Sequence, residues 1–235
     1  MTDFSFPEKP NYNFTKGQTL ERKKILKNKV EHIKFKDLKN TNELIEAYSK
    51  SSFQARKIGE GAKLYKKELN RGTTIIWSLA GSIFSAGLRE LVIDSVRKNL
   101  VDCLVCTGAL FEQDMLEALG YNHYVQTEEI EDKTLQNLLI DRIYDHLLDE
   151  IELQHVDETY KKIAKQMDSG NYSSREFMEY CGKWLSNVKD ANDSVILAAY
   201  EMNVPIFIPA INDCSIGIGL AMNQSEVKNG ISIDS

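Results

Sequence analysis

Small and hydroxyl-bearing residues gather in three short segments, each directly after a run of apolar residues. The segments are residues 81–87, 107–109 and 213–219. Small side chains let backbone N–H groups approach a phosphate closely, and a helix that begins there adds the positive end of its dipole. Glycine and serine also occupy such turns for backbone geometry alone, and no segment has the G-x-G-x-x-G spacing of a dinucleotide fingerprint. A phosphate-binding edge and three ordinary turns both remain open interpretations.

The apolar runs before these segments define the fold. Residues 73–80, 100–106 and 204–211 are rich in apolar and β-branched residues that do not alternate regularly with polar ones, which is typical of parallel strands buried on both faces. Helices are expected over residues 88–99, from near Glu112, and over residues 194–202, so strand, turn and helix alternate as in βαβ units. We predict a three-layer, Rossmann-like α/β sandwich with a central, mainly parallel sheet. Its turns would meet at the carboxyl edge, where ligands bind in such sheets.

The remaining segments give a coarse domain plan. Residues 1–40 are polar and lysine-rich, and we expect an extended arm or a loosely held helix. Helical spacing predicts one helix over residues 41–69, with Thr41 as its N-cap. Another helix is expected through Leu138, Leu139, Ile143, Leu147 and Leu148, and a capping box, Ser173 to Glu176, should start a further one. The plan is an N-terminal arm at residues 1–40, a domain at residues 41–225 and a frayed tail at residues 226–235.

Cysteine and histidine offer little further chemistry. Cys103 and Cys106 form a C-x-x-C, but it lies inside an apolar strand and no second pair follows at zinc-ligand spacing. We interpret both thiols as structural. The four histidines lie in polar or helix-surface contexts and are expected to be solvated; they are His32, His123, His146 and His155.

Composition narrows the class of protein. The net charge of −6 argues against a nucleic-acid surface, which needs a basic stripe. The N-terminus lacks the basic and apolar regions of a signal peptide. Apolar runs fall short of the roughly 20 residues that span a bilayer. We therefore expect a cytoplasmic protein that binds neither nucleic acid nor membrane.

Several sequence blocks together resemble the deoxyhypusine synthase family. They are WSLAGSIFSAGLR at residues 77–89, NLVDCLVCTG at 99–108, FEQD at 111–114, IDRIYD at 140–145 and VPIFIPAINDCSIG at 204–217. The resemblance covers about residues 40–225. It implies an NAD-dependent reaction in which the aminobutyl group of spermidine passes through an imine on a lysine to a lysine of translation factor 5A. It also implies homotetramers whose sites are shared across a dimer interface.

The resemblance also assigns site residues. The expected NAD contacts are Gly81, Ser82, Ile83, Phe84, Ser85, Thr107, Gly108, Ala109 and Asp213, and the expected substrate contacts are Glu112 and Gln113. Asp213 would follow the third strand, where a carboxylate can accept hydrogen bonds from a ribose.

The sequence departs from the family pattern in places that concern the amine. Gln113 stands where the family has a glutamate, and Ile218 stands where it has an aspartate. Each loss removes a charge-assisted contact worth about 1.5–3 kcal/mol. The W-G-K segment that carries the family's nucleophilic lysine has no counterpart in these residues, and we expect no catalytic residue here, because the imine cannot form without its lysine.

Three hypotheses follow from these departures. The chain is a pseudoenzyme or regulatory subunit with a weak NAD site, an NAD-dependent enzyme with altered chemistry, or a synthase completed by residues elsewhere. The changes at Gln113 and Ile218 count against the third. We expect a homo-oligomer, dimer or tetramer, or a hetero-oligomer with a full-length relative, because the sheet would otherwise leave an unpaired edge.

Overall fold

The computed structural model describes residues 6, 9–227 and 229–234. The chain divides into two compact units, residues 1–72 and residues 73–235. This boundary at Gly72 differs from the expected one at residue 40. Among the described residues, no helix is long and apolar enough to cross a membrane.

The first unit is helical. Its elements are α1 (Lys16–Ile25), the 3-10 helix η1 (Phe35–Asp37), α2 (Thr41–Ser49) and α3 (Phe53–Arg71). Thr15 and Gln18 form a capping box at the start of α1, so part of the expected arm is a well-capped helix. Phe4, one of the arm's apolar residues, lies outside the described residues.

The single helix predicted over residues 41–69 is wrong, because α2 and α3 are separate. Ser52 is extended and Phe53 has a φ of 55°, and a positive φ cannot continue a right-handed helix. The two helices then pack closely, since a side chain at Gly59 would overlap the backbone of Ser49. Helix α3 ends at Gly72, a C-cap with a left-handed φ of 69°.

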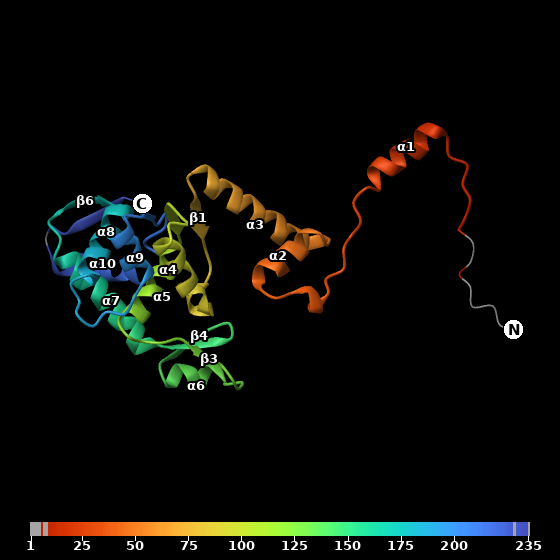
Figure 1. Cartoon of the computed structure of the whole chain (residues 1–235). Coiled ribbons are helices and arrows are strands. Elements are labelled where there is room, and N and C mark those ends of the chain that lie inside the picture. The colour runs from red at the N-terminus through yellow and green to blue at the C-terminus, as the bar shows by residue number, and fades with distance from the viewer. Residues whose placement is uncertain (1–5, 7–8, 228, 235) are drawn as a thin grey trace. The chain divides into compact units, whose positions relative to one another are not determined.

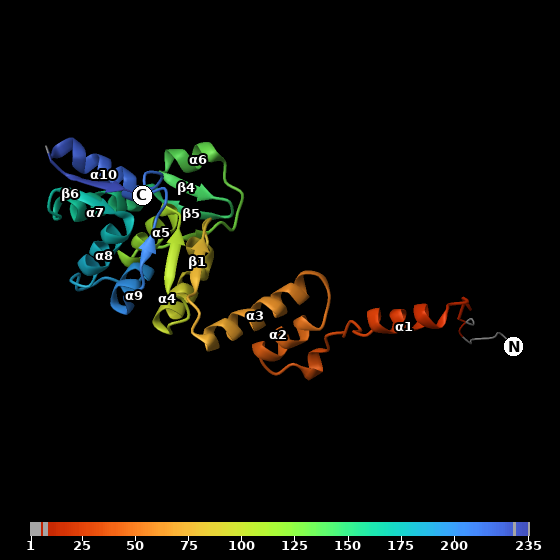
Figure 2. The same cartoon turned by 90° about the horizontal axis from the view of Figure 1, so that it is seen from above.

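The second unit is built on a parallel sheet of three strands in the order β1-β2-β7 (Figures 1 and 2). The strands are β1 (Ile76–Leu79), β2 (Cys103–Cys106) and β7 (Ile206–Phe207). Residue pairs such as Trp77 with Leu104 and Leu104 with Ile206 set the register. The predicted α/β class, with a central parallel sheet and Rossmann-like layering, is confirmed.

Helices cover this sheet and build the core with it. They are the π-helical turn η2 (Phe84–Leu88), α4 (Arg89–Arg97), α5 (Gly108–Ala118), α7 (Glu150–Lys165), α8 (Ser174–Leu185), α9 (Val195–Met202) and α10 (Ser215–Glu226). The predicted capping box from Ser173 to Glu176 begins α8. Fully buried Phe84, Phe111 and Tyr160 belong to the single hydrophobic cluster that these helices share.

One predicted strand is less buried than expected. β2 lies in the middle of the sheet and alternates partly buried with buried residues, but β1 is an edge strand and Ile76 is 61% exposed. The run of β-branched and apolar residues from 73 to 80 therefore does not mean burial on both faces in this chain.

Two smaller sheets correct two further predictions. The residues expected to form a helix around Leu139 and Leu148 form a hairpin of β4 (Ile140–Ile143) and β5 (His146–Asp149), which also pairs with β3 (Tyr124–Val125). Leu139 and Tyr144 have φ values of 54° and 58°, which interrupt a helix on both sides of β4. Helix α6 (Asp132–Asn137) precedes this hairpin.

The frayed tail is also wrong for the described part of residues 226–235. β8 (Ile231–Asp234) pairs in parallel with β6 (Gly170–Ser173), and Ile231 is buried. Residues 228 and 235 lie outside the described residues.

Two of the four histidines are not solvated. The side chains of His123 and His146 are 6% and 12% exposed, and their rings meet edge to face at 5.9 Å. His123 Nδ1 lies 3.0 Å from Glu117 Oε1. The cysteines are free thiols, and burial raises the pKa of Cys106 to about 12, which agrees with a structural role.

Candidate functional site

The three small-residue turns meet at the carboxyl edge of the sheet. β1, β2 and β7 run in parallel, so the turns that follow them leave from the same side. The Thr107 amide donates a 3.3 Å hydrogen bond to the Leu79 carbonyl, which joins the end of β2 to the end of β1. The predicted convergence of these turns at one edge is therefore present in the structure.

The turn after β2 packs directly against the turn after β7. Gly108 is buried at the start of α5, and a methyl group there would overlap Cys214 Sγ and lie 3.0 Å from Cys214 Cβ. Gly217 is similarly required, because a side chain there would lie 2.6 Å from Asn212 Cα. These two glycines permit a backbone spacing that any other residue would widen.

Three consecutive residues of α5 hold three different segments in place. Glu112 Oε2 accepts a 2.8 Å hydrogen bond from the Ser215 amide, at the start of α10. Gln113 Oε1 accepts a 3.1 Å bond from the Ser85 amide, in the turn after β1. Asp114 accepts 3.0 Å bonds from the Val195 and Ile196 amides at the start of α9.

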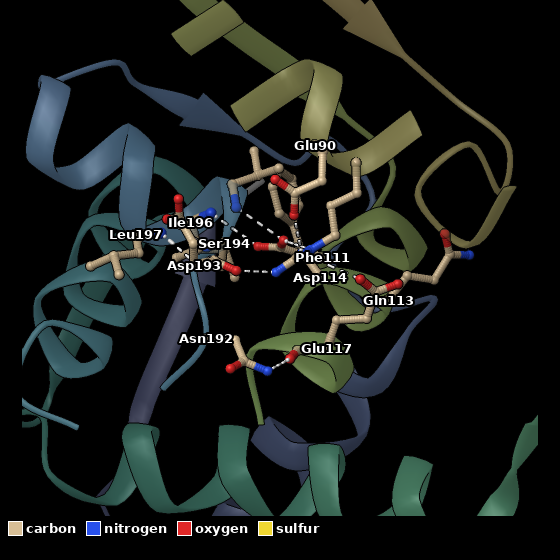
Figure 3. Close-up of polar contacts among 12 residues, drawn as sticks. Glu90, Phe111, Gln113, Asp114, Glu117, Asn192, Asp193, Ser194, Ile196 and Leu197 are labelled. Carbon is tan, nitrogen blue, oxygen red and sulfur yellow. Dashed lines mark hydrogen bonds and ion pairs between the residues drawn. The ribbon is translucent and has the colours of Figure 1, made fainter. Parts of the chain in front are cut away.

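Asp114 also forms the most deeply buried ion pair described for this unit (Figure 3). Its side chain is fully buried, and Arg89 Nε lies 2.7 Å from Asp114 Oδ1. Arg89 additionally contacts Glu90, Glu117 and the Asp193 carbonyl. Burial raises the pKa of the Asp114 carboxyl, while Arg89 and the two α9 amides counteract that rise. The pair fixes α4, α5 and α9 to one another.

Carboxylates that interact electrostatically with one another extend from this edge toward α7. Burial raises the pKa of Glu112, and the Ser215 amide lowers it in part. Burial likewise raises the pKa of Asp157, which contacts the Ser215 side chain. A hydrogen bond with Glu150 raises the pKa of Asp141 to about 6. Each of these carboxyl groups would ionise more readily beside a cation.

The predicted site residues differ in what they present to solvent. Gly81, Thr107 and Asp213 are exposed, and the partly buried ones are Ser82, Ile83, Ser85 and Ala109. Phe84 and Gly108 are buried, so only their backbone could face a ligand; Phe84 packs edge to face on Phe111, 6.3 Å between ring centroids. Ile218 is half exposed.

Sequence reasoning missed the carboxylates of the hairpin and of α7. Asp141, Glu150 and Asp157 are brought near Glu112 by tertiary packing. Asp141 lies in the block at residues 140–145, whose resemblance to the family was the one available signal. No local pattern in the sequence distinguishes Asp157 from other acidic residues of an amphipathic helix.

The residues at this edge fit a dinucleotide. The turn at residues 81–85 and the start of α5 are made of small residues, which suits close approach of pyrophosphate oxygens. Asp213 presents an exposed carboxylate in the segment between β7 and α10, where it could accept hydrogen bonds from ribose hydroxyls. Other hollows lie elsewhere, including one of about 350 Å³ at the amino end of β7, lined by Arg175, Tyr200 and Pro205 among others.

Fold and edge together define an α/β protein of Rossmann-like layering with three small-residue turns at the carboxyl ends of its parallel strands. A comparison with known families matches residues 43–235 to deoxyhypusine synthase. The chain belongs to the deoxyhypusine synthase family.

Individual relatives agree with this assignment. The chain is 40% identical over 200 residues to a deoxyhypusine synthase-like protein of Elusimicrobium minutum. The matched region covers 84% of this chain and 53% of that protein. The chain is also 38% identical over 221 residues to a deoxyhypusine synthase-like protein of Chlorobaculum parvum, with 93% and 63% covered. The chain thus spans between half and two thirds of the length of these relatives.

A solved structure supports the fold. An Entamoeba histolytica protein described as a candidate deoxyhypusine synthase matches with a TM-score of 0.58, covering 88% of this chain and 73% of that one. At 19% identity, this likeness concerns the fold.

Proposed function

We propose that the carboxyl edge of the parallel sheet is a binding site for NAD within a deoxyhypusine synthase-like protein. The observation that carries this proposal is the anchoring of both flanking turns to α5, through Gln113 with Ser85 and Glu112 with Ser215. Because these contacts fix the turns before any ligand arrives, little ordering cost remains for binding.

Different residues of this edge would contact different parts of NAD. Backbone groups of residues 81–85 and 107–109 would face the phosphates, and Asp213 would accept hydrogen bonds from a ribose. NAD, when bound, supplies a hydride acceptor for oxidation of an amine-bearing carbon. We expect weak binding, because none of the three turns has the G-x-G-x-x-G spacing of a dinucleotide fingerprint.

The carboxylates beside this edge suit a cationic amine. Glu112 and Asp157 both have raised pKa values through burial, and a neighbouring ammonium group would stabilise their ionised forms. Spermidine, the substrate that the family resemblance implies, is such an amine. Two positions near this edge carry no carboxylate. Gln113 has a neutral amide that accepts a hydrogen bond from the Ser85 backbone, and Ile218 is apolar.

We also propose that these 235 residues on their own do not transfer the aminobutyl group. An imine mechanism requires a lysine nucleophile, and the described residues that converge on this edge include none. Lys161, on the neighbouring helix α7, is paired with Glu158 and Glu226. The chain would then be a pseudoenzyme or a regulatory subunit.

An NAD-dependent enzyme with altered or retained aminobutyltransferase-type chemistry is the second candidate. The observation that favours it is the proximity of the carboxylates Glu112, Asp141 and Asp157 in one cluster. A site without any use for an amine would have no reason to keep like charges together, since they repel.

Assembly with other chains is part of the proposal. β1 is an edge strand with Ile76 largely exposed, and such edges are normally covered or paired. We propose a homo-oligomer, or a hetero-oligomer with a full-length relative. Translation factor 5A is the protein partner that the family resemblance implies.

Calorimetric titration with NAD tests the cofactor proposal. We expect weak, saturable binding that Asp213→Ala reduces and Asp190→Ala, at an exposed aspartate elsewhere, leaves unchanged. Equal effects of the two substitutions would contradict the assignment of Asp213.

Mass spectrometry after incubation with spermidine, NAD and borohydride tests the catalytic proposal. We expect no aminobutyl-sized adduct on any lysine of this chain. An adduct would replace the pseudoenzyme proposal with the second candidate.

A further inference from the structure

The turn after β1 has an unusual backbone. Gly81, before the π-helical turn η2, and Gly87, within it, have φ values of 79° and 87°. In η2 the Leu88 amide bonds to the Ile83 carbonyl at 3.1 Å. π-Helical turns are rare and occur often at functional sites. Such a turn needs contacts from outside itself to hold its shape.

Helix α5 supplies two of those contacts. Phe111 packs on Phe84 from the core side of the turn. Gln113, a residue that is 3% exposed, extends away from Asp114 toward the turn (Figure 3), and its side chain accepts a hydrogen bond from the Ser85 amide at 3.1 Å. The Gln113 oxygen is therefore committed to the backbone of the turn.

We propose that Gln113 is a positioning residue, whose neutral amide oxygen holds the Ser85 amide and thereby fixes the shape of the turn that faces the dinucleotide. This inference rests on the proposed NAD site for its functional meaning, but the contact itself is a property of the chain alone. It assigns to Gln113 a role other than contact with a substrate amine.

The neighbours of Gln113 explain why an amide suits this position. Glu112 and Asp114 flank it in sequence, and both are carboxylates whose pKa values burial raises. A third adjacent carboxylate at 3% exposure would add desolvation and like-charge repulsion. Glutamine provides the same acceptor geometry without that charge.

Hydrogen exchange of single amides tests the inference in the full chain, because three consecutive side chains hold three separate amides. Ser85 reports on Gln113, Ser215 on Glu112 and Ile196 on Asp114. In Gln113→Met, which keeps the length of the side chain but removes the acceptor, we expect Ser85 to exchange about tenfold faster relative to Ile196. In Gln113→Glu, which keeps the acceptor, the ratio should stay near that of the natural chain.

A matched control separates this effect from general loosening. Gln136→Met makes the same substitution at an exposed position of α6 and should leave the hydrogen exchange of all three amides unchanged. Equal acceleration of Ser85, Ser215 and Ile196 in Gln113→Met would mean that Gln113 only contributes to overall stability, and unchanged Ser85 exchange would mean that its contact holds nothing. If Gln113→Met does not fold, loss of Ser85 protection in Gln113→Glu overturns the inference and its retention supports it.

Titration of the same variants with NAD links the turn to the site. We expect Gln113→Met to weaken NAD binding and Gln113→Glu to preserve most of it. Absence of NAD binding by the natural chain would overturn the proposed function while leaving the exchange test of Gln113 intact.

Discussion

Replacement of Asp114 by asparagine is the sharpest test of how this unit is held together. The Asp114 carboxylate accepts hydrogen bonds from Arg89 Nε at 2.7 Å and from two α9 amides at 3.0 Å. Asparagine retains one oxygen, so one carboxylate oxygen is replaced by an NH₂ group that faces a donor. It also leaves Arg89, whose side chain is 6% exposed, without its nearest counter-charge.

The expected cost follows from burial. Removal of one partner from a buried ion pair typically costs about 3–5 kcal/mol. Arg89 keeps contacts with Glu90 and Glu117 at 3.1 and 3.3 Å, which places this variant near the lower end. We therefore expect Asp114→Asn to lower the free energy of unfolding by about 3 kcal/mol.

Urea unfolding followed by circular dichroism measures this loss. The matched control is Asp94→Asn, which breaks the exposed pair of Asp94 with Lys98, both about two thirds exposed at 66% and 63%. Exposed pairs of this type contribute about 0.3–0.5 kcal/mol. Equal losses in the two variants would refute the argument from burial.

A second substitution tests the cause. Arg89→Met in the Asp114→Asn background removes the unpaired charge and keeps an acceptor oxygen for α9. We expect the double variant to lose less stability than the sum of the single variants, because the two residues interact directly. Additive losses would show that the ion pair is not what couples α4 to α5.

Three further predictions concern other contacts. Gly108→Ala should cost about 1–3 kcal/mol by overlap with Cys214, and Cys214→Ala should relieve part of that loss in urea unfolding. Asp141 has a folded-state pKa of about 6, above its unfolded value, so stability falls as pH rises through about 6, where the hydrogen bond of protonated Asp141 with Glu150 is replaced by like-charge repulsion. Glu150→Gln should accordingly stabilise the chain by about 0.5–1 kcal/mol at pH 7.5, with the gain reduced for partial solvent screening, and have little effect near pH 4; a larger gain at pH 4 would contradict this sign. Tyr160→Phe removes a buried 2.9 Å hydrogen bond to the Phe111 carbonyl and should lower the melting temperature, at a cost of about 1 kcal/mol.

Local sequence patterns were sufficient to predict the parallel sheet and the place of its turns. Residues 100–106 and 204–211 contain strands because their apolar side chains need burial between layers. The small residues after them identified the carboxyl edge. These features depend mainly on neighbours in the sequence, so the sequence alone could reveal them.

Long-range pairing decided the elements that were predicted wrongly. The apolar residues around Leu139 and Leu148 suit one face of a helix, but β5 pairs with β3, where His146 lies opposite Val125. β8 pairs with β6 about sixty positions earlier in the chain, where Ile231 lies opposite Gly170. A strand's partner is not encoded in its own pattern, and the burial of His123 and His146 depends on the same pairing.

Helix geometry limits what the consecutive residues Glu112, Gln113 and Asp114 can contact together. Successive residues of an α-helix point about 100° apart, so three consecutive polar residues cannot all face one ligand. The structure sends each to a separate backbone segment: Glu112 to α10, Gln113 to the turn after β1, and Asp114 to α9. Helix α5 therefore sets the distance between the two turns that flank the candidate site, since each turn is bonded to the same helical turn. A substitution of any of these three side chains should therefore alter the backbone positions at the edge of the sheet, even where that side chain never touches the ligand.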